Sequence, residues 1–218
     1  MVHPSFLRPH RLVMVIGTAT EIGKTWVGGQ TLAVLRGAGA AVAARKPAQS
    51  ADPSETGPSD ADVLAAATGE DPFDVCPAHR RYTVAMAPPM AAEALGLPVP
   101  TMDELVAELR WPEPVPDLGW VETVGGPRSP IAVDGDAVDL ADRIDPDVVV
   151  LVADAGLGTV NAVLLAAAPF AGRELVVVLN RFDPADDLHR RNREWLTTRQ
   201  GLGIVVDPEA LARFLLPR

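Results

Sequence analysis

The chain has 218 residues, 48% of them hydrophobic and 22% charged, and a formal net charge of −10. This length and composition suit one domain with a sizeable buried core. The negative charge argues against a surface for nucleic acid or for an anionic membrane, because both attract basic patches. The single cysteine, Cys76, cannot form an internal disulfide, and no cysteine–histidine spacing is typical of a zinc site.

The N-terminal segment lacks the uninterrupted apolar core of a signal peptide, and no apolar run reaches the roughly 18 residues that a membrane span needs. We therefore expect a cytoplasmic protein that binds neither membrane nor nucleic acid. We expect one domain over residues 1–218, with residues 1–10 as a poorly ordered extension.

Short apolar runs alternate with helix-like segments along the chain. Six of these runs predict buried strands, at 12–16, 40–44, 120–124, 148–153, 175–179 and 204–206. Helices are expected at 25–36, 60–68, 86–95, 102–109, 138–144, 160–168, 188–199 and 208–216. Segments 49–59 and 110–118, which are rich in proline and polar residues, predict loops. The alternation predicts an α/β fold, a three-layer α/β/α sandwich with a mostly parallel sheet.

The first expected strand runs into the loop Gly-Thr-Ala-Thr-Glu-Ile-Gly-Lys-Thr, residues 17–25, and then into a helix. Backbone N–H groups of such a loop surround polyphosphate oxygens, while Lys24 would neutralise the outer phosphates and Thr25 would hold Mg²⁺. Five residues separate Gly17 from Gly23, one more than in the general pattern. The loop predicts a nucleoside triphosphate site in a fold like that of P-loop NTPases.

Polar residues follow the next expected strands. Lys46 ends the second strand and could face the phosphates, and Ser50 is a candidate hydrogen-bond donor to a substrate. Asp60 begins a helix, where a carboxylate also suits the helix dipole. Glu122 and Asp154 each follow an apolar run, and either could be the magnesium-directed acid of a phosphate-loop enzyme. The strand pattern does not separate these two.

Two further motifs lie near the C-terminus. The segment Gly-Leu-Gly-Thr-Val-Asn, residues 156–161, begins a helix with exposed backbone donors and suits a carboxylate or phosphate. Asn180 ends the fifth expected strand, and its amide could present a donor and an acceptor to a purine.

Taken in order, these motifs resemble dethiobiotin synthetase, from about residue 13 to about residue 206. The resemblance implies a homodimeric ligase, dependent on Mg²⁺ and ATP, that joins carbon dioxide to 7,8-diaminopelargonate and closes a ureido ring. It implies catalytic roles for Lys46 and Lys24, and it favours Glu122 over Asp154 as the magnesium acid.

The resemblance also implies the remaining site residues. ATP would be bound by Gly17, Thr18, Thr20, Glu21, Ile22, Gly23, Lys24, Thr25, Trp26, Asp60, Glu122, Gly125, Asn180 and Arg181. Magnesium would be held by Thr25, Asp60 and Glu122. The substrate would be bound by Ser50, Gly158, Thr159 and Asn161, the last three across the dimer interface.

The sequence departs from the family pattern at Ala19, Ala51, Thr123, Val124 and Arg181, and we expect these residues to crowd or alter the active site. Three alternatives therefore stand beside the resemblance. The chain could be a degenerate paralogue that binds nucleotide without making dethiobiotin. It could be a partition-type ATPase switch, although those proteins carry a second lysine near the start of the loop. It could be another amide-forming ligase, although those need a glutamine-handling domain.

Overall fold

The computed structural model describes residues 8–54 and 56–216. Most of the expected N-terminal extension, residues 1–7, lies outside the described residues. The rest of it packs on the domain: Arg8 donates a hydrogen bond of 2.7 Å to the Asp145 carbonyl, and Pro9 is buried. The chain therefore meets the sheet before its first strand begins.

Within the part of the chain that the structure describes, the central sheet has six strands, all parallel, in the order β10-β9-β8-β1-β5-β2. The strands are β1 (Arg11–Gly17), β2 (Val42–Arg45), β5 (Leu118–Glu122), β8 (Val148–Asp154), β9 (Leu175–Asn180) and β10 (Gly203–Val205). Each corresponds to one of the six apolar runs in the sequence. The expected parallel α/β fold is confirmed.

The side chains of β1 alternate between two cores, as the pleat of a strand requires. Val13 and Val15 belong to one buried cluster, and Leu12, Met14 and Ile16 belong to the other. Because both faces are covered, the central strands are apolar throughout.

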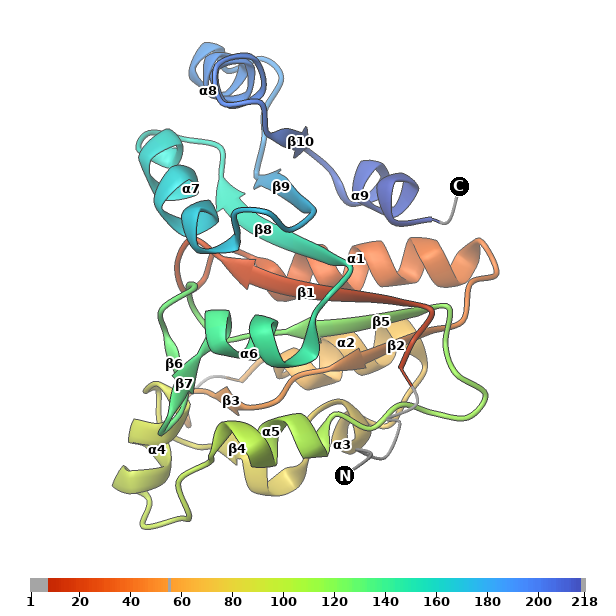
Figure 1. Ribbon diagram of the computed structural model, residues 1–218, viewed down its shortest axis with the longest axis vertical. Coiled ribbons are helices and arrows are strands. Elements are labelled where there is room, and N and C mark those ends of the chain that lie inside the picture. Colours follow the sequence, from red (N-terminus) through yellow and green to blue (C-terminus); the bar gives the residue numbers. More distant parts are fainter. Residues whose placement is uncertain (1–7, 55, 217–218) are drawn as a thin grey trace.

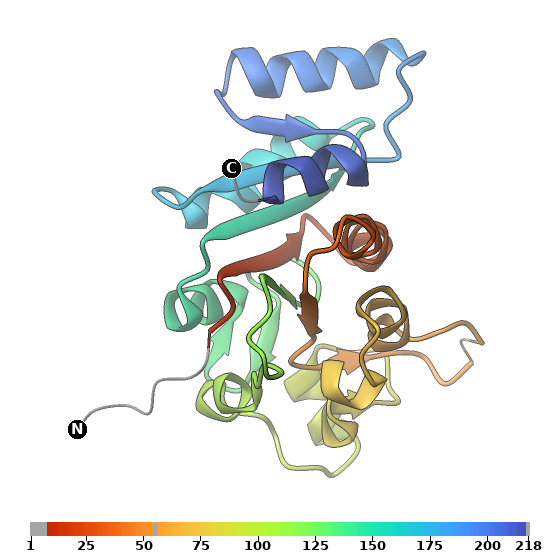
Figure 2. The same cartoon turned by 90° about the vertical axis from the view of Figure 1, so that its right-hand side faces the viewer.

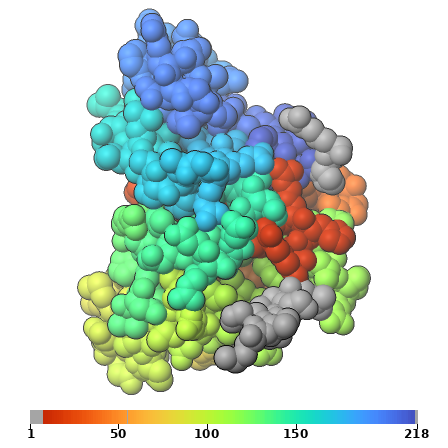
Figure 3. Space-filling model, viewed as in Figure 1, coloured from red at the N-terminus to blue at the C-terminus, as the bar shows by residue number. Residues whose placement is uncertain are grey.

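Helices cover both faces of the sheet (Figures 1 and 2). One face packs against α1 (Lys24–Gly37), α2 (Asp60–Thr68) and α9 (Pro208–Leu215). The other face packs against α5 (Met102–Glu108), α6 (Ala137–Ile144), α7 (Thr159–Ala167) and α8 (Asp187–Thr198). Figure 3 shows α8, in blue, projecting at the end of the molecule opposite the yellow segment around α4 (Pro88–Ala94). No helix within residues 8–54 and 56–216 is long and apolar enough to cross a membrane.

Several short elements differ from the sequence prediction. The expected loop 49–59 begins with β3 (Gln49–Ser50), which pairs in parallel with β4 (Arg81–Tyr82). The expected helix 86–95 begins only at Pro88, because a proline disfavours the helical conformation in the residue before it but suits the first helical turn. A hairpin of β6 (Pro130–Ala132) and β7 (Gly135–Asp136), the one-turn α3 (Pro72–Val75) and two 3₁₀ turns, η1 (Ala78–Arg80) and η2 (Ala168–Phe170), also form.

Helix α1 approaches its neighbours through two interior glycines. A Cβ on Gly28 would lie 3.0 Å from Leu64 and 3.1 Å from the ring of Trp120, and one on Gly29 would lie 2.9 Å from Val63. The absence of side chains at these two positions lets α1 lie close to α2 and β5.

The order of the strands decides where functional groups can gather. Strand β1 lies between β5 and β8. After β1 the chain first forms β2 and β5 on one side of it, and then forms β8, β9 and β10 on the other side. In parallel α/β sheets, ligands bind outside the carboxyl ends of the strands at such a switch point. Residues that follow β1, β2, β5, β8 and β9 therefore meet at one edge.

Candidate functional site

The glycine-rich loop after β1 is held from both sides. The N–H of Gly17 donates to the carbonyl of Gly125 at 3.2 Å, and the N–H of Thr18 donates to Val152 at 2.9 Å. A Cβ on Gly17 would lie 2.8 Å from the Ala19 carbonyl, so the loop closes only around a glycine there.

The loop ends in Gly23, whose φ of 91° lies in the left-handed region that favours glycine. Gly23 is also the N-cap of α1, and no side chain of the described residues caps this helix. The first N–H groups of α1 therefore face the cavity without a side-chain partner, which is the arrangement that binds phosphate at helix N-termini. Trp26, in the first turn, is half exposed.

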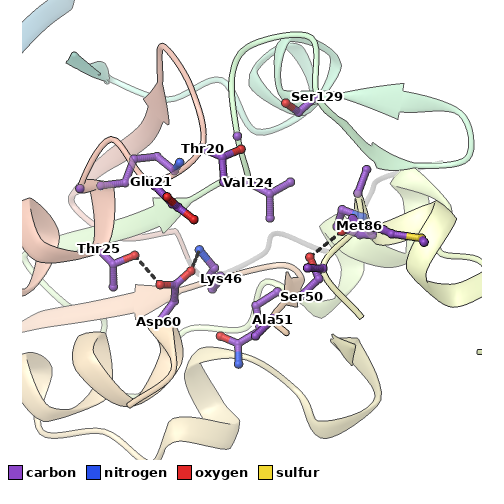
Figure 4. A pocket seen from close by; sticks show the side chains of 17 residues that line it. Thr20, Glu21, Thr25, Lys46, Ser50, Ala51, Asp60, Met86, Val124 and Ser129 are labelled. Atoms are coloured by element: carbon purple, nitrogen blue, oxygen red, sulfur yellow. Dashed lines mark hydrogen bonds and ion pairs between the residues drawn. The ribbon is translucent and has the colours of Figure 1, made fainter. Parts of the chain in front are cut away.

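Four polar side chains, those of Thr25, Lys46, Asp60 and Glu122, meet beside the start of α1, and Figure 4 shows the first three of them. The Nζ of Lys46 lies 2.6 Å from Asp60 Oδ2 and 2.7 Å from Glu122 Oε1. The hydroxyl of Thr25 lies 2.7 Å from both Asp60 Oδ1 and Glu122 Oε1. The sequence predicted all four residues, which come from α1, α2 and the ends of β2 and β5.

This cluster is strongly charged although it is mostly buried. Lys46 is 2% exposed and Glu122 is 0% exposed. Burial alone would lower the pKa of Lys46, but Glu122 and Asp60 outweigh it and raise this pKa above its ordinary value. For the carboxyl group of Asp60 burial has the opposite effect and would raise the pKa, but Lys46 holds this pKa below 3.8. Both groups are therefore charged at neutral pH.

Lys24 lies close to the cluster and is also buried. Burial is the main influence on its ammonium group and lowers its pKa, although Glu122 acts in the opposite direction. Lys24 lines the cavity together with Lys46. An anion bound there would meet two ammonium groups, and its charge would offset the burial of Lys24.

A cavity of about 520 Å³ opens over this cluster. Its polar wall is formed by the phosphate loop and the charged cluster, and its opposite wall by the segment before α4. The lining residues include Thr20, Glu21, Gly23, Lys24, Thr25, Lys46, Ser50, Ala51, Asp60, Met86, Val124, Gly125 and Ser129. The hydroxyl of Ser50 donates to the Met86 carbonyl at 2.6 Å, which ties β3 to the far wall.

Only some of the unusual residues of the sequence crowd this cavity. Ala51 and Val124 line it, and Figure 4 shows Val124 between Thr20 and Ser50. Thr123 does not line it: its side chain is buried and its hydroxyl donates to the Val15 carbonyl at 3.1 Å. The expectation that Thr123 crowds the site is therefore wrong, because its side chain turns into the sheet.

Asp154 and Glu122 have different surroundings. Asp154 Oδ1 accepts a hydrogen bond from the Gly156 N–H at 2.8 Å, and its Oδ2 lies 3.2 Å from Arg181 Nη1. Neither carboxylate lines the main cavity itself, but Glu122 contacts Thr25 and Lys46, which do line it, whereas Asp154 contacts Arg181.

The two residues at the end of β9 contact the phosphate loop. Asn180 Nδ2 donates to the Ile22 carbonyl at 2.9 Å, and Arg181 Nη2 donates to the Glu21 carbonyl at 3.0 Å. A Cβ on Gly23 would lie 2.2 Å from Asn180 Nδ2. β9 therefore supports the loop directly.

The motif at the start of α7 lies apart from the main cavity. Gly158 has a φ of 91°, and the buried Oγ1 of Thr159 has no hydrogen-bond partner among the described residues. Asn161 lines a neighbouring depression that also contains Thr20 and Leu165. Leu157 is 92% exposed and Leu165 is also exposed.

Sequence reasoning missed several residues that line the main cavity. Met86 and Ala87 lie in a range that the sequence predicts as helix, and Ser129 lies in a segment that carries no motif. Ser129 Oγ accepts from the Gly126 N–H at 2.9 Å, and the glycine pair before it was the available signal.

A glycine-rich loop between a parallel strand and a helix, with lysines, carboxylates and a threonine hydroxyl around it, defines a P-loop nucleotide-binding protein. A family model described as an AAA domain matches residues 11–208. In the solved structures, a protein described as a plasmid partition protein of Borrelia burgdorferi, bound to AMPPNP, has a TM-score of 0.53 at 12% identity, covering 95% of this chain and 89% of that one. At this identity the likeness shows the fold alone.

The curated relatives narrow the class. The chain is 32% identical to the ATP-dependent dethiobiotin synthetase of Haloferax mediterranei, over 89% of this chain and 82% of that protein. It is 34% identical to that of Rhodococcus erythropolis, over 89% and 86%, and 35% identical to that of Anaeromyxobacter dehalogenans, over 93% of each chain. The chain belongs to the dethiobiotin synthetase family.

Proposed function

We propose that the protein is an ATP-dependent cyclo-ligase that converts 7,8-diaminopelargonate and carbon dioxide to dethiobiotin, with release of ADP and phosphate. Family membership supports the reaction class. The observation that carries the proposal is the position of Lys46, which is buried against Asp60 and Glu122 and lines the same cavity as Lys24 and Ser50.

The phosphate loop and the start of α1 form the nucleotide end of the proposed site. The uncapped N–H groups of α1 would bind phosphate oxygens, and Lys24 would lie beside the outer phosphates. Gly125 lines the same cavity and holds the start of the loop. ATP as the co-substrate follows from the family.

The cluster fits a magnesium ion. Thr25, Asp60 and Glu122 offer only oxygen donors, which Mg²⁺ prefers, and Glu122 Oε2 is buried without a hydrogen-bond partner in the described part of the chain. These three residues would hold the ion. An ion held there would supply positive charge that offsets the negative charge developing on the phosphate oxygens.

The chemistry would follow from charge and position. One amine of the substrate attacks carbon dioxide to form a carbamate, whose oxygen attacks the γ-phosphorus as ADP leaves. The second amine then attacks the carbamoyl carbon and expels phosphate. Lys46 and Lys24 would stabilise the negative charge on the transferring oxygens. Because both amines belong to one molecule, ring closure gains the advantage of held reactants.

We also propose a homodimer in which the start of α7 completes the site of a second copy. Gly158, Thr159 and Asn161 would receive the substrate carboxylate at the helix N-terminus, where backbone N–H groups suit an anion. The exposed Leu157 and Leu165 would be covered by the second copy. A cytoplasmic location, with ATP and carbon dioxide at hand, would serve this reaction.

The decisive experiment incubates the purified protein with diaminopelargonate, bicarbonate, Mg²⁺ and ATP and measures dethiobiotin by mass spectrometry. Product that requires all four components supports the proposal. ATP hydrolysis that ignores the diamine would favour a nucleotide switch, and nucleotide binding without product would favour a degenerate paralogue. Lys46→Ala should abolish product while ATP affinity stays within about tenfold.

A further inference from the structure

Arg181 reaches from the end of β9 back to the phosphate loop. Its Nη2 donates to the Glu21 carbonyl at 3.0 Å, and its Nη1 lies 3.2 Å from Asp154 Oδ2. The other oxygen of Asp154 accepts from the Gly156 N–H, which fixes the carboxylate. The preceding residue, Asn180, donates a hydrogen bond to the next carbonyl of the loop, that of Ile22. The last residue of β9 and the residue after it thus hold two successive peptide groups.

The backbone is strained at both ends of the arginine contact. Glu21 and Arg181 each have a φ of 58°, in the left-handed region that residues with a Cβ rarely adopt. Such conformations persist where surrounding contacts enforce them, and they often mark functional sites. The loop is also one residue longer than the general pattern, and its tip is contacted from outside by Asn180 and Arg181.

The direction of these hydrogen bonds determines which way the loop presents its donors. A trans peptide group is planar, so a carbonyl and the N–H of the next residue point in opposite directions. With the carbonyls of Glu21 and Ile22 held by Arg181 and Asn180, the N–H groups of Ile22 and Gly23 turn to the other side. Gly23 lines the cavity, so that side is where phosphate would lie.

We propose that Arg181 is a positioning residue that holds the tip of the phosphate loop in its anion-binding form and does not read the nucleotide base. Asp154 orients the guanidinium. The ion pair itself is 60% and 45% exposed and adds little. The effect comes from the hydrogen bond to Glu21. This inference rests on the nucleotide-binding part of the proposed function and not on ring closure.

The test compares Mg²⁺ complexes of ATP, GTP and inorganic tripolyphosphate by titration calorimetry. Arg181→Ala should raise the dissociation constants of all three by the same factor, about three- to tenfold, the range of one net hydrogen bond. Arg181→Lys keeps a positive charge but loses the planar, two-pronged donor group, so its dissociation constants should lie between those of the unaltered protein and of Arg181→Ala. The KM for ATP should rise by the same factor, while that for the diamine does not move.

A double-mutant cycle tests the route through Asp154. Asp154→Asn should weaken binding by a smaller factor, and its effect should largely vanish when Arg181 is already alanine. The matched control is Arg191→Ala, which removes an exposed arginine paired with Asp187 on α8 and should leave all three affinities unchanged.

Distinct results would overturn the inference. If Arg181→Ala weakens ATP but not tripolyphosphate, Arg181 contacts the base or sugar and the positioning role is wrong. If it weakens neither, the contact with Glu21 has no function. Failure of the unaltered protein to bind any of the three ligands would overturn both this inference and the proposed function. Tight binding without dethiobiotin production would overturn only the proposed function.

Discussion

The Lys46→Met variant should be much less stable than the unaltered protein, although the substitution changes the volume of the side chain little. Methionine keeps most of the volume of the side chain but removes the ammonium group. Glu122, which is completely buried, would keep its contact with Thr25 and lose its ion pair, and Asp60 would lose its 2.6 Å contact. The variant would therefore hold two neighbouring carboxylates without a compensating lysine between them.

The magnitude follows from the burial of the partners. Removing one member of a buried ion pair costs about 3–5 kcal/mol. The side chain of Asp60 is 45% exposed and can regain water, so we expect the lower end, about 3 kcal/mol. At about 2–4 °C per kcal/mol for a chain of this size, the melting temperature should fall by roughly 6–12 °C.

The assay is urea unfolding without nucleotide and with a chelator, followed by tryptophan fluorescence, for which the buried Trp120 is a suitable probe. The control is Arg143→Met, which removes an exposed ion pair with Asp103 and should cost less than about 1 kcal/mol. Adding Glu122→Gln to Lys46→Met should recover part of the lost stability. A Lys46→Met variant within about 1 kcal/mol of the unaltered protein would refute the reasoning.

Three further predictions concern the same edge of the sheet. Gly23→Ala would place a Cβ 2.2 Å from the Asn180 side-chain amide and should weaken ATP binding at least tenfold, as measured by calorimetry. The control is Gly39→Ala, at a similar φ and with no described atom within 4 Å, which should lower the free energy of unfolding by only about 1 kcal/mol. Val124→Ala should lower the KM for the diamine, and an unchanged KM would show that this side chain does not narrow the cavity. Burial acts to raise the pKa of Asp60, but Lys46 keeps this pKa depressed. The ionised Asp60 therefore stabilises the folded protein above pH 3.8, and this contribution is lost as the pH falls further. Asp60→Asn should remove this contribution to the acid dependence of the urea midpoint.

The strands could be predicted because a parallel sheet covered on both faces leaves a plain trace in the sequence. The run at 148–153 is apolar without interruption, and β8 is buried along the same residues. The short pairs β3 with β4 and β6 with β7 could not be predicted, since two or three residues show no period. Helix α3, one turn long, was missed for the same reason.

Much of the candidate site could also be predicted, because carboxyl ends of parallel strands meet at one edge. The sequence predicts Lys46 and Glu122 as site residues because each stands at the end of an apolar strand, and the Nζ of Lys46 lies 2.7 Å from Glu122 Oε1. The strand pattern could not rank Glu122 against Asp154, since the difference lies in their neighbours. The inward turn of Thr123 and the reach of Arg181 depend on side-chain directions, which no spacing in the sequence records.

The two glycines inside α1 have a consequence for folding. Each glycine in a helix interior costs about 1 kcal/mol relative to alanine, so the segment 24–37 is a poor helix on its own. It gains its shape only by docking closely on Trp120 and Leu64. We therefore expect the N-terminal end of this helix to form together with the sheet beneath it, and a partly unfolded form that releases α1 should also lose the proposed phosphate site.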